Sequence, residues 1–302
     1  MTDSFAKYRL EPHRDFGFLQ VRPTPTPEEI TRYYADEFYS TQYPKFNNSL
    51  LEVQIQDREF HEAHWIDICE AVEKVAGRPL QGQKILDVGC GWALALGVFS
   101  SRGAECFGFD PAPEAVEYAR RQGHNVRVAG MESAEVFPGE RFDVVTLLNV
   151  LEHLADPVAV MRQLRERVLK PGGVLVIEVP NEFNAFQVCA QRSLGLREWW
   201  VAPPAHLNYF NGETLSRLLA GTGFTVASLQ ASFPMELFLL FGENYVADGK
   251  LGRGCHARRV AFEMNMRKNG FGDVLQELYG SLARQNLGRQ VTTYAVSQGV
   301  DG

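Results

Sequence analysis

Short apolar runs alternate with amphipathic segments along the middle of the chain. The runs KILDVGC, ECFGFD, NVRVAG, FDVVTLLNV and GVLVIEVP lie between residues 84 and 180, and the stretches 92–102, 112–122 and 157–169 show helical spacing. Uninterrupted apolar runs are typical of parallel strands buried on both faces, and helices connect such strands. The pattern therefore predicts an α/β fold with a doubly wound, mostly parallel sheet, whose ligand lies beyond the carboxyl ends of the strands.

The segment before the sheet predicts an N-terminal extension with a helical cap. Residues 10–22 alternate loosely between apolar and polar positions, which indicates a short hairpin, and the prolines within 23–27 then keep the chain extended. Thr26 and Glu29 have the spacing of a capping box, so we expect a helix to begin there. A single long amphipathic helix is predicted over 51–75.

Alternation breaks after the fifth apolar run, and the rest of the chain predicts two insertions. Residues 182–210 have no clean period, and a mostly helical block precedes the final apolar strand VTTYAV. We expect both to cover an acceptor pocket, although the helical block could instead bury its apolar stripes in a homodimer. The predicted parts are an N-terminal extension or lid (1–50), a core (51–234) with a substrate-covering insertion (182–210), a helical insertion (235–289), and the last strand with the tail (290–302).

The loop Asp87-Val88-Gly89-Cys90-Gly91 follows one predicted strand and opens a helix. Its glycines permit a tight turn and let a ligand approach bare backbone. A dinucleotide site is disfavoured, because Leu94 replaces the third glycine of G-x-G-x-x-G and the charge of Asp87 would oppose a pyrophosphate. That charge would attract a sulfonium or an ammonium. Asp110 ends the next strand at a spacing suited to a ribose diol.

Five segments in order carry a family resemblance: ILDVGCG, GFD, AGMESAEVFP, FDVVTLLNVLEHL and LKPGGVLVIEVPN. Together they resemble the class I S-adenosylmethionine-dependent methyltransferases, which implies a Rossmann-like methyltransferase fold, an enzyme, and S-adenosylmethionine as the cofactor. Tyr39 and Tyr43 belong to a tyrosine-rich segment that would fold over the cofactor as a lid or else belong to the core. The predicted cofactor-binding residues are Asp87, Gly89, Cys90, Gly91, Asp110, Pro111, Met131, Glu132, Asn149, Tyr39 and Tyr43.

Two further segments, VRPTPTPEEITRYYADEFY and PPAHLNYFNGETLSRLLAGTGF, resemble a subgroup that acts on small molecules and sugars. Many members of that subgroup place a cysteine-bound zinc ribbon before the proline stretch. Here the corresponding EPHRDFGFLQVRP has no cysteine, and the five cysteines of the chain are scattered without a CxxC pair. We therefore predict a metal-free remnant of the ribbon and no metal site.

Methylation of a hydroxyl requires removal of its proton, and histidine is the natural base near neutral pH. His206 follows the fifth strand and is the candidate base, or else a structural or substrate-binding histidine. His153 and Asn181 are further catalytic candidates, His153 with a structural role as the alternative, and Glu178 is a weaker one. The predicted substrate-binding residues are Trp199, Trp200, Tyr209 and Arg258, with a local core, an interface or a solvated helix face as their alternatives.

The composition of the chain limits the classes of substrate and partner that we expect. The 302 residues include 30 Lys and Arg against 37 Asp and Glu, a net charge of −7, which weighs against a nucleic-acid substrate. The N-terminus lacks a signal-peptide core, and the apolar run 233–241 is too short to span a bilayer. We expect a cytoplasmic protein, without a membrane span, that acts on a small molecule or glycan.

These patterns predict an S-adenosylmethionine-dependent methyltransferase. O-methylation of a sugar or nucleotide-sugar is the preferred reaction, on the subgroup resemblance alone. The alternatives are an N-methyltransferase, a natural-product or quinone-type O-methyltransferase, and an inactive methyltransferase-like scaffold subunit.

Overall fold

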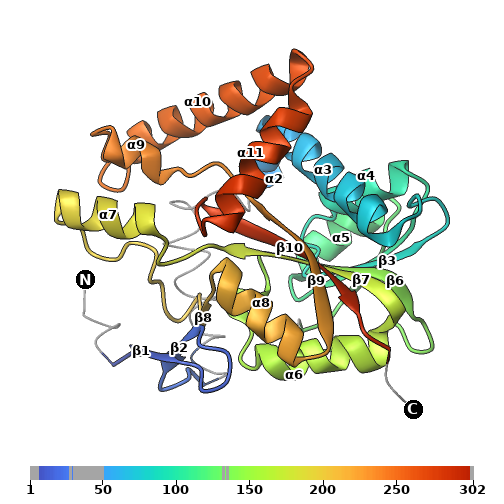
Figure 1. Cartoon of the computed structure of the whole chain (residues 1–302). Helices are drawn as coiled ribbons and strands as arrows, with labels where there is room; N and C mark the ends of the chain where they lie inside the picture. The colour runs from blue at the N-terminus through green and yellow to red at the C-terminus, as the bar shows by residue number, and fades with distance from the viewer. Residues whose placement is uncertain (1–6, 27–28, 30–50, 131–132, 134–135, 300–302) are drawn as a thin grey trace. The chain divides into compact units, whose positions relative to one another are not determined.

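The computed structural model describes residues 7–26, 29, 51–130, 133 and 136–299 of the chain (Figure 1). These residues group into two compact units, each built from separate stretches of sequence. The sheet unit comprises Asp57–Val179, Leu215–Ser228 and Thr292–Gly302. The insertion unit comprises Met1–Gln56, Pro180–Thr214 and Leu229–Val291.

A seven-stranded sheet has the order β5-β4-β3-β6-β7-β10-β9. Neighbouring strands from β5 to β7 pair in parallel, which confirms the predicted doubly wound, mostly parallel sheet. The strands are β3 (Lys84–Val88), β4 (Glu105–Asp110), β5 (Asn125–Val128), β6 (Phe142–Leu148), β7 (Leu169–Pro180), β9 (Phe224–Ala231) and β10 (Gln290–Ser297).

Helices precede or connect these strands along the chain. They are α3 (Arg58–Ala76), α4 (Leu94–Ser101), α5 (Pro113–Arg121), α6 (Pro157–Gln163) and α8 (Gly212–Gly221). Ile68 and Val72 of α3 pack with Leu96 of α4 in one hydrophobic cluster that includes Val144 and Val176 of the sheet. This cluster is the core of the sheet unit.

The helix expected over 51–75 is two helices, α2 (Leu51–Gln56) and α3, which are separated at Asp57. No residue of α2 is buried, whereas Phe60, Ile68 and Val72 of α3 are. The apolar stripe that suggested one helix therefore belongs to α3 alone.

The insertion unit contains a three-stranded sheet in the order β1-β2-β8. The expected hairpin is confirmed as β1 (Arg9–Pro12) paired antiparallel with β2 (Leu19–Arg22), and β8 (Asn208–Tyr209) adds to β2. The capping box is also confirmed: the backbone N–H of Thr26 donates to Glu29 Oε2 at 3.0 Å, and the N–H of Glu29 donates to Thr26 Oγ1 at 3.2 Å.

Besides α2, the described part of this unit contains the helices α7 (Ala185–Leu194), α9 (Glu236–Leu240), α10 (Gly249–Lys268) and α11 (Gly272–Arg284). The sequence did not predict α7, because its fully buried residues are only Gln187 and Ala190 and give no apolar stripe. Its ends do carry signals, since the side chain of Asn184 caps the first turn and Gly195 ends the helix with a φ of 62°.

The apolar stripe of α11 is only partly covered within the described chain. Leu275 is buried, whereas Val274 and Leu278 are exposed. The homodimer therefore stays a prediction. None of the described helices is both long and apolar enough to traverse a bilayer.

Candidate functional site

The glycine loop follows β3. At this strand the order in which successive strands are added to the sheet reverses. β4 and β5 lie on one side of β3, and β6 and β7 lie on the other. Ligands of open α/β sheets bind at this switch point. The N–H groups of Gly89 and Cys90 both donate to the carbonyl of Phe109, at 2.8 and 3.1 Å, and so tie the loop to β4. Gly91 has a φ of 50° and open space where a Cβ would stand, so its backbone is accessible to a ligand.

Asp87 is a buried carboxyl beside this loop, with only 3% of its surface exposed. Thr146 Oγ1 donates to Asp87 Oδ1 at 2.6 Å. Burial raises the pKa of Asp87 to about 7, the charge of Asp110 adds to this, and the Thr146 hydrogen bond opposes it. A buried carboxyl that titrates near neutral pH would be ionised by a cationic ligand.

Asp110 ends β4, and each oxygen of its carboxylate accepts a hydrogen bond from a backbone N–H group. Its Oδ2 accepts the N–H of Gly91 at 3.0 Å, and its Oδ1 accepts the N–H of Ala112 at 2.8 Å. Each oxygen keeps a lone pair for a further donor, which suits a diol. Pro111, the predicted adenine neighbour, follows it and is exposed.

Asn149, at the end of β6, contacts another acid of the sheet unit. It has a φ of 58°, its backbone N–H donates to the Glu178 carbonyl at 2.8 Å, and its Nδ2 donates to Glu178 Oε1 at 3.1 Å. Glu178 is buried and also accepts from Thr292 Oγ1 and from His64 Nε2, each at 2.8 Å. Sequence reasoning missed His64, Thr292 and Thr146. A signal existed for His64 and Thr146, since each is a polar residue within an apolar pattern.

His153 lies in the short 3₁₀ turn Leu151–His153 that follows β6. Its Nε2 is 3.7 Å from Oε1 of the buried Glu152. The catalytic role of His153 stays a prediction.

His206 and Tyr209 belong to one turn of the insertion unit. The Tyr209 hydroxyl donates to the His206 carbonyl at 3.1 Å and accepts the N–H of Ala202 at 3.0 Å. Tyr209 is buried, and its hydroxyl therefore stabilises the turn that contains His206. His206 Nδ1 is 3.8 Å from Oε1 of the buried Glu182.

Other predicted side chains of the insertion unit already have structural partners. Asn181 is buried, and its Nδ2 donates to the carbonyls of Asn286 and Gly288 at 3.3 and 3.2 Å. Arg258 pairs with Glu243, with Nη1 2.9 Å from Oε1, and lies over the ring of Phe238. The structure gives both side chains structural contacts, and the catalytic role of Asn181 and the substrate-binding role of Arg258 stay predictions.

Trp199 and Trp200 form an aromatic cluster with Phe183. The two indole rings meet edge to face at 4.6 Å, and Trp200, which is buried, meets Phe183 at 5.4 Å. Trp200 is thus part of a local core, and Trp199 is the more accessible of the two.

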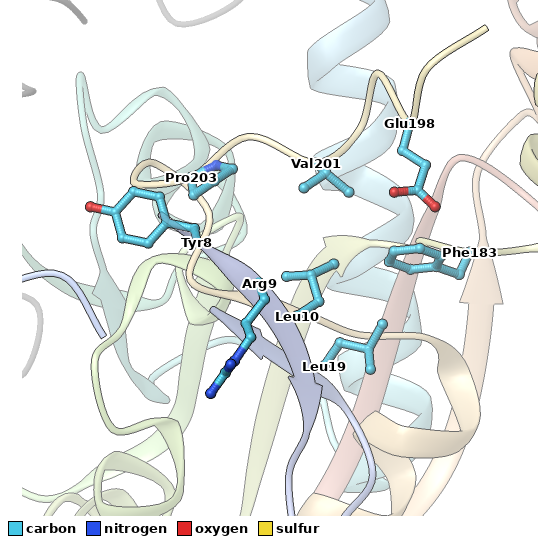
Figure 2. Close-up of a pocket in the computed structure, with 8 residues that line it drawn as sticks. All are labelled: Tyr8, Arg9, Leu10, Leu19, Phe183, Glu198, Val201 and Pro203. Atoms are coloured by element: carbon cyan, nitrogen blue, oxygen red, sulfur yellow. The ribbon is translucent and has the colours of Figure 1, made fainter. Parts of the chain in front are cut away.

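A cavity of about 360 Å³ lies beside this cluster in the insertion unit (Figure 2). Leu10, Leu19, Val201 and Phe183 form its apolar part, and the Glu198 carboxylate lies near the Phe183 ring. The full lining is Tyr8, Arg9, Leu10, Leu19, Phe183, Glu198, Val201 and Pro203. No predicted site residue lines it.

The predicted cofactor contacts Met131, Glu132, Tyr39 and Tyr43 lie outside the described residues. The adenine segment and the tyrosine lid therefore stay predictions.

The family model described as "Methyltransferase domain" matches residues 58–229. Because the match covers more than half of the chain, the chain belongs to this family of class I S-adenosylmethionine-dependent methyltransferases. S-adenosylmethionine is accordingly the cofactor.

Three similar proteins illustrate how far the resemblance to known proteins extends. The ubiquinone biosynthesis O-methyltransferase of Cereibacter sphaeroides is 38% identical over 108 residues, which cover 34% of this chain and 43% of that protein. The Pseudomonas aeruginosa protein of the same name is 35% identical over 135 residues, which cover 42% and 56%. A solved S-adenosylmethionine-dependent methyltransferase from Archaeoglobus fulgidus has a TM-score of 0.51 and 19% identity, covering 86% of this chain and all of that one, and this similarity shows the fold alone. The aligned region spans about half the length of the curated relatives.

The residues of the sheet unit fit this cofactor. A buried carboxyl with a raised pKa at Asp87 suits a cationic group, and Asp110 has acceptor capacity left for a ribose diol. The accessible backbone at Gly91 lies between these two groups in sequence and is bonded to Asp110.

Asp110→Ala is expected to weaken S-adenosylmethionine binding by roughly 30- to 150-fold, or about 2–3 kcal/mol. The variant loses the proposed ribose contacts and releases the Gly91 N–H. Calorimetry measures the effect, and Glu114→Ala, an exposed acid in the first turn of α5, is the matched control. Equal dissociation constants for Asp110→Ala and wild type would mean that the ribose binds elsewhere.

Proposed function

We propose that this chain transfers the methyl group of S-adenosylmethionine to a hydroxyl of a small aromatic acceptor of the phenol or quinol type. The observation that carries the methyl-transfer part is the pair of carboxyls, Asp87 and Asp110, on the two sides of the glycine loop at the switch point of the sheet. Their charge matches a ligand that carries a sulfonium and a ribose.

The acceptor class is supported by the relatives, whose name is ubiquinone biosynthesis O-methyltransferase. The alignment covers only part of those proteins, so the acceptor is inferred from the shared methyltransferase region. The sugar acceptor expected from the subgroup resemblance has no such support and serves as the rival in the test.

The chain has three tasks in this reaction. Bound S-adenosylmethionine supplies a methyl group that is already activated by the sulfonium. Asp87 and Asp110 bind and orient that cofactor, the segments around it exclude water, and a base takes the acceptor's proton. His206, close to buried Glu182, stays the sequence-based candidate for this base, and His64 is the candidate that the contacts of the sheet unit add.

An acceptor screen tests the proposal. Purified chain and S-adenosylmethionine are incubated with catechol, 4-nitrocatechol, 3,4-dihydroxybenzoate, UDP-glucose or UDP-N-acetylglucosamine, and S-adenosylhomocysteine release and product mass are measured. We expect methylation of the catechols, reduced at low cofactor concentration by Asp110→Ala. Methylation of the sugar nucleotides alone would return the function to sugar O-methylation. Cofactor binding without turnover of any acceptor would favour a scaffold subunit.

A further inference from the structure

His64 interrupts the apolar stripe of α3. Phe60 and Ile68, four residues before and after it, are buried in the sheet unit, whereas the His64 side chain is 34% exposed. An imidazole between two buried apolar residues lies at the edge of the core, with one side packed and one side accessible. Its packed side meets a carboxylate, as the 2.8 Å contact between Nε2 and Glu178 Oε2 shows.

Glu178 is ionised in spite of its burial. Burial alone would raise its pKa, but the charge of His64 and hydrogen bonds from His64, Thr292 and Asn149 lower the pKa to about 2. Oε2 accepts Thr292 Oγ1, and Oε1 accepts Asn149 Nδ2. An ionised carboxylate can only accept hydrogen bonds, so the proton of a neutral His64 is on Nε2. The lone pair is then on Nδ1, the nitrogen that does not face Glu178.

The strand register puts this pair at the edge of the sheet where ligands bind. Asp87 is level with Thr146 on β6, Thr146 is level with Val176 on β7, and Glu178 is the next residue of β7 on the same face. Side chains two residues apart share a face of a sheet. Glu178 is therefore one pleat beyond Asp87 towards the carboxyl ends, and two strands, or roughly 10 Å, across the sheet.

We propose that His64 is the general base of the reaction and that Glu178 is its positioning residue; this proposal rests on the proposed hydroxyl methylation. The acceptor oxygen forms a bond to the methyl carbon as the carbon–sulfur bond breaks and its electron pair goes to sulfur. The hydroxyl proton passes to Nδ1 of His64, and the Glu178 carboxylate stabilises the resulting imidazolium. The imidazolium then returns the proton to water.

A further titratable group interacts with Glu178. Tyr294 on β10 interacts electrostatically with Glu178 and with Asp67 of α3. Burial raises the pKa of Tyr294 well above its ordinary value, so its hydroxyl stays neutral.

The first test is independent of any acceptor. Nitrogen-15 NMR of histidine-labelled protein, with the His64 signals assigned by their absence in His64→Gln, reports which ring nitrogen bears the proton. We expect the Nε2–H tautomer in the wild type and a mixture of tautomers in Glu178→Gln. A dominant Nδ1–H tautomer in the wild type would overturn the proposal.

The second test compares acceptors of different acidity. His64→Gln is expected to lower turnover of catechol about a hundredfold, with a much smaller loss on 4-nitrocatechol, whose hydroxyl is already largely ionised near neutral pH. Binding of S-adenosylhomocysteine should stay within twofold of wild type. His61→Gln, a histidine on the same helix, is the matched control and should keep wild-type turnover.

Equal losses on both catechols, or a loss in His206→Gln with none in His64→Gln, would contradict a base at His64. If the wild type methylates neither catechol, the proposed phenolic acceptor fails, and the tautomer measurement still decides whether His64 presents a basic Nδ1.

Discussion

S-adenosylmethionine binding is expected to weaken about a hundredfold between pH 7 and pH 5, and Asp87→Asn is expected to abolish that dependence. Burial raises the pKa of Asp87 to about 7, so its carboxyl gains a proton as the pH falls through neutrality. A bound cation favours the ionised form, and each pH unit below 7 therefore costs up to tenfold in affinity. The asparagine variant should bind at all pH values about as weakly as the wild type at pH 5.

Calorimetry in buffers of different ionisation enthalpy checks this linkage. At pH 6 the wild type should release close to one proton per S-adenosylmethionine bound, and Asp87→Asn should release much less. A pH-independent wild-type affinity would mean that Asp87 does not face the cationic part of the cofactor.

Asp87→Asn should also stabilise the ligand-free protein. The folded-state pKa of Asp87 lies above its ordinary value, so the stability of the fold declines as pH rises towards 7 and the buried group ionises. Asp87→Asn removes that cost, which is at most about 4 kcal/mol above pH 7, and gives little gain at pH 4. Urea unfolding at both pH values measures the difference. Asp143→Asn is the contrasting control and should destabilise: burial opposes the charge of Asp143, but bonds from Lys170 and Lys84 and the charges of Lys170 and Arg78 lower its pKa.

Arg289→Met is expected to destabilise the insertion unit by about 2–4 kcal/mol. Arg289 Nη1 lies 3.3 Å from Oε1 of Glu236, which is fully buried, and the Arg289 guanidinium also attracts the buried Glu182. Without the guanidinium two buried carboxylates lack their counter-charge. The expected loss of stability is smaller than for a fully buried ion pair because the Arg289 side chain is 33% exposed.

Chemical denaturation of the variant and the wild type tests this. Arg258→Met is the matched control, because its pair with Glu243 is at the surface and its removal should change stability little. The double variant Arg289→Met/Glu236→Gln should recover part of the loss. An additive double variant would show that the two side chains are not coupled.

The buried strands and the cofactor loop could be predicted from the sequence because their signals are local. Continuous apolar runs mark buried parallel strands, and the turn after β3 needs glycine at Gly89 and Gly91, whose φ values are positive. Thr26 and Glu29 are three residues apart and cap each other, so their pairing can be predicted from the local sequence. The class of protein followed from the order of such local segments.

Only the tertiary structure decided which distant side chains meet. His64, Glu178 and Thr292 are separated by more than a hundred residues at each step, and no periodicity along the chain relates them. The contacts of the Asn181 side-chain amide with the carbonyls of Asn286 and Gly288 could not be predicted either, because those residues are more than a hundred positions away. Helix α7 was not predicted because it buries few apolar residues and so shows no apolar stripe in the sequence. The physical reason is common to all three: local propensity and hydrophobic period specify elements, whereas hydrogen-bond partners, burial and the pKa values that follow from them depend on contacts made when those elements pack.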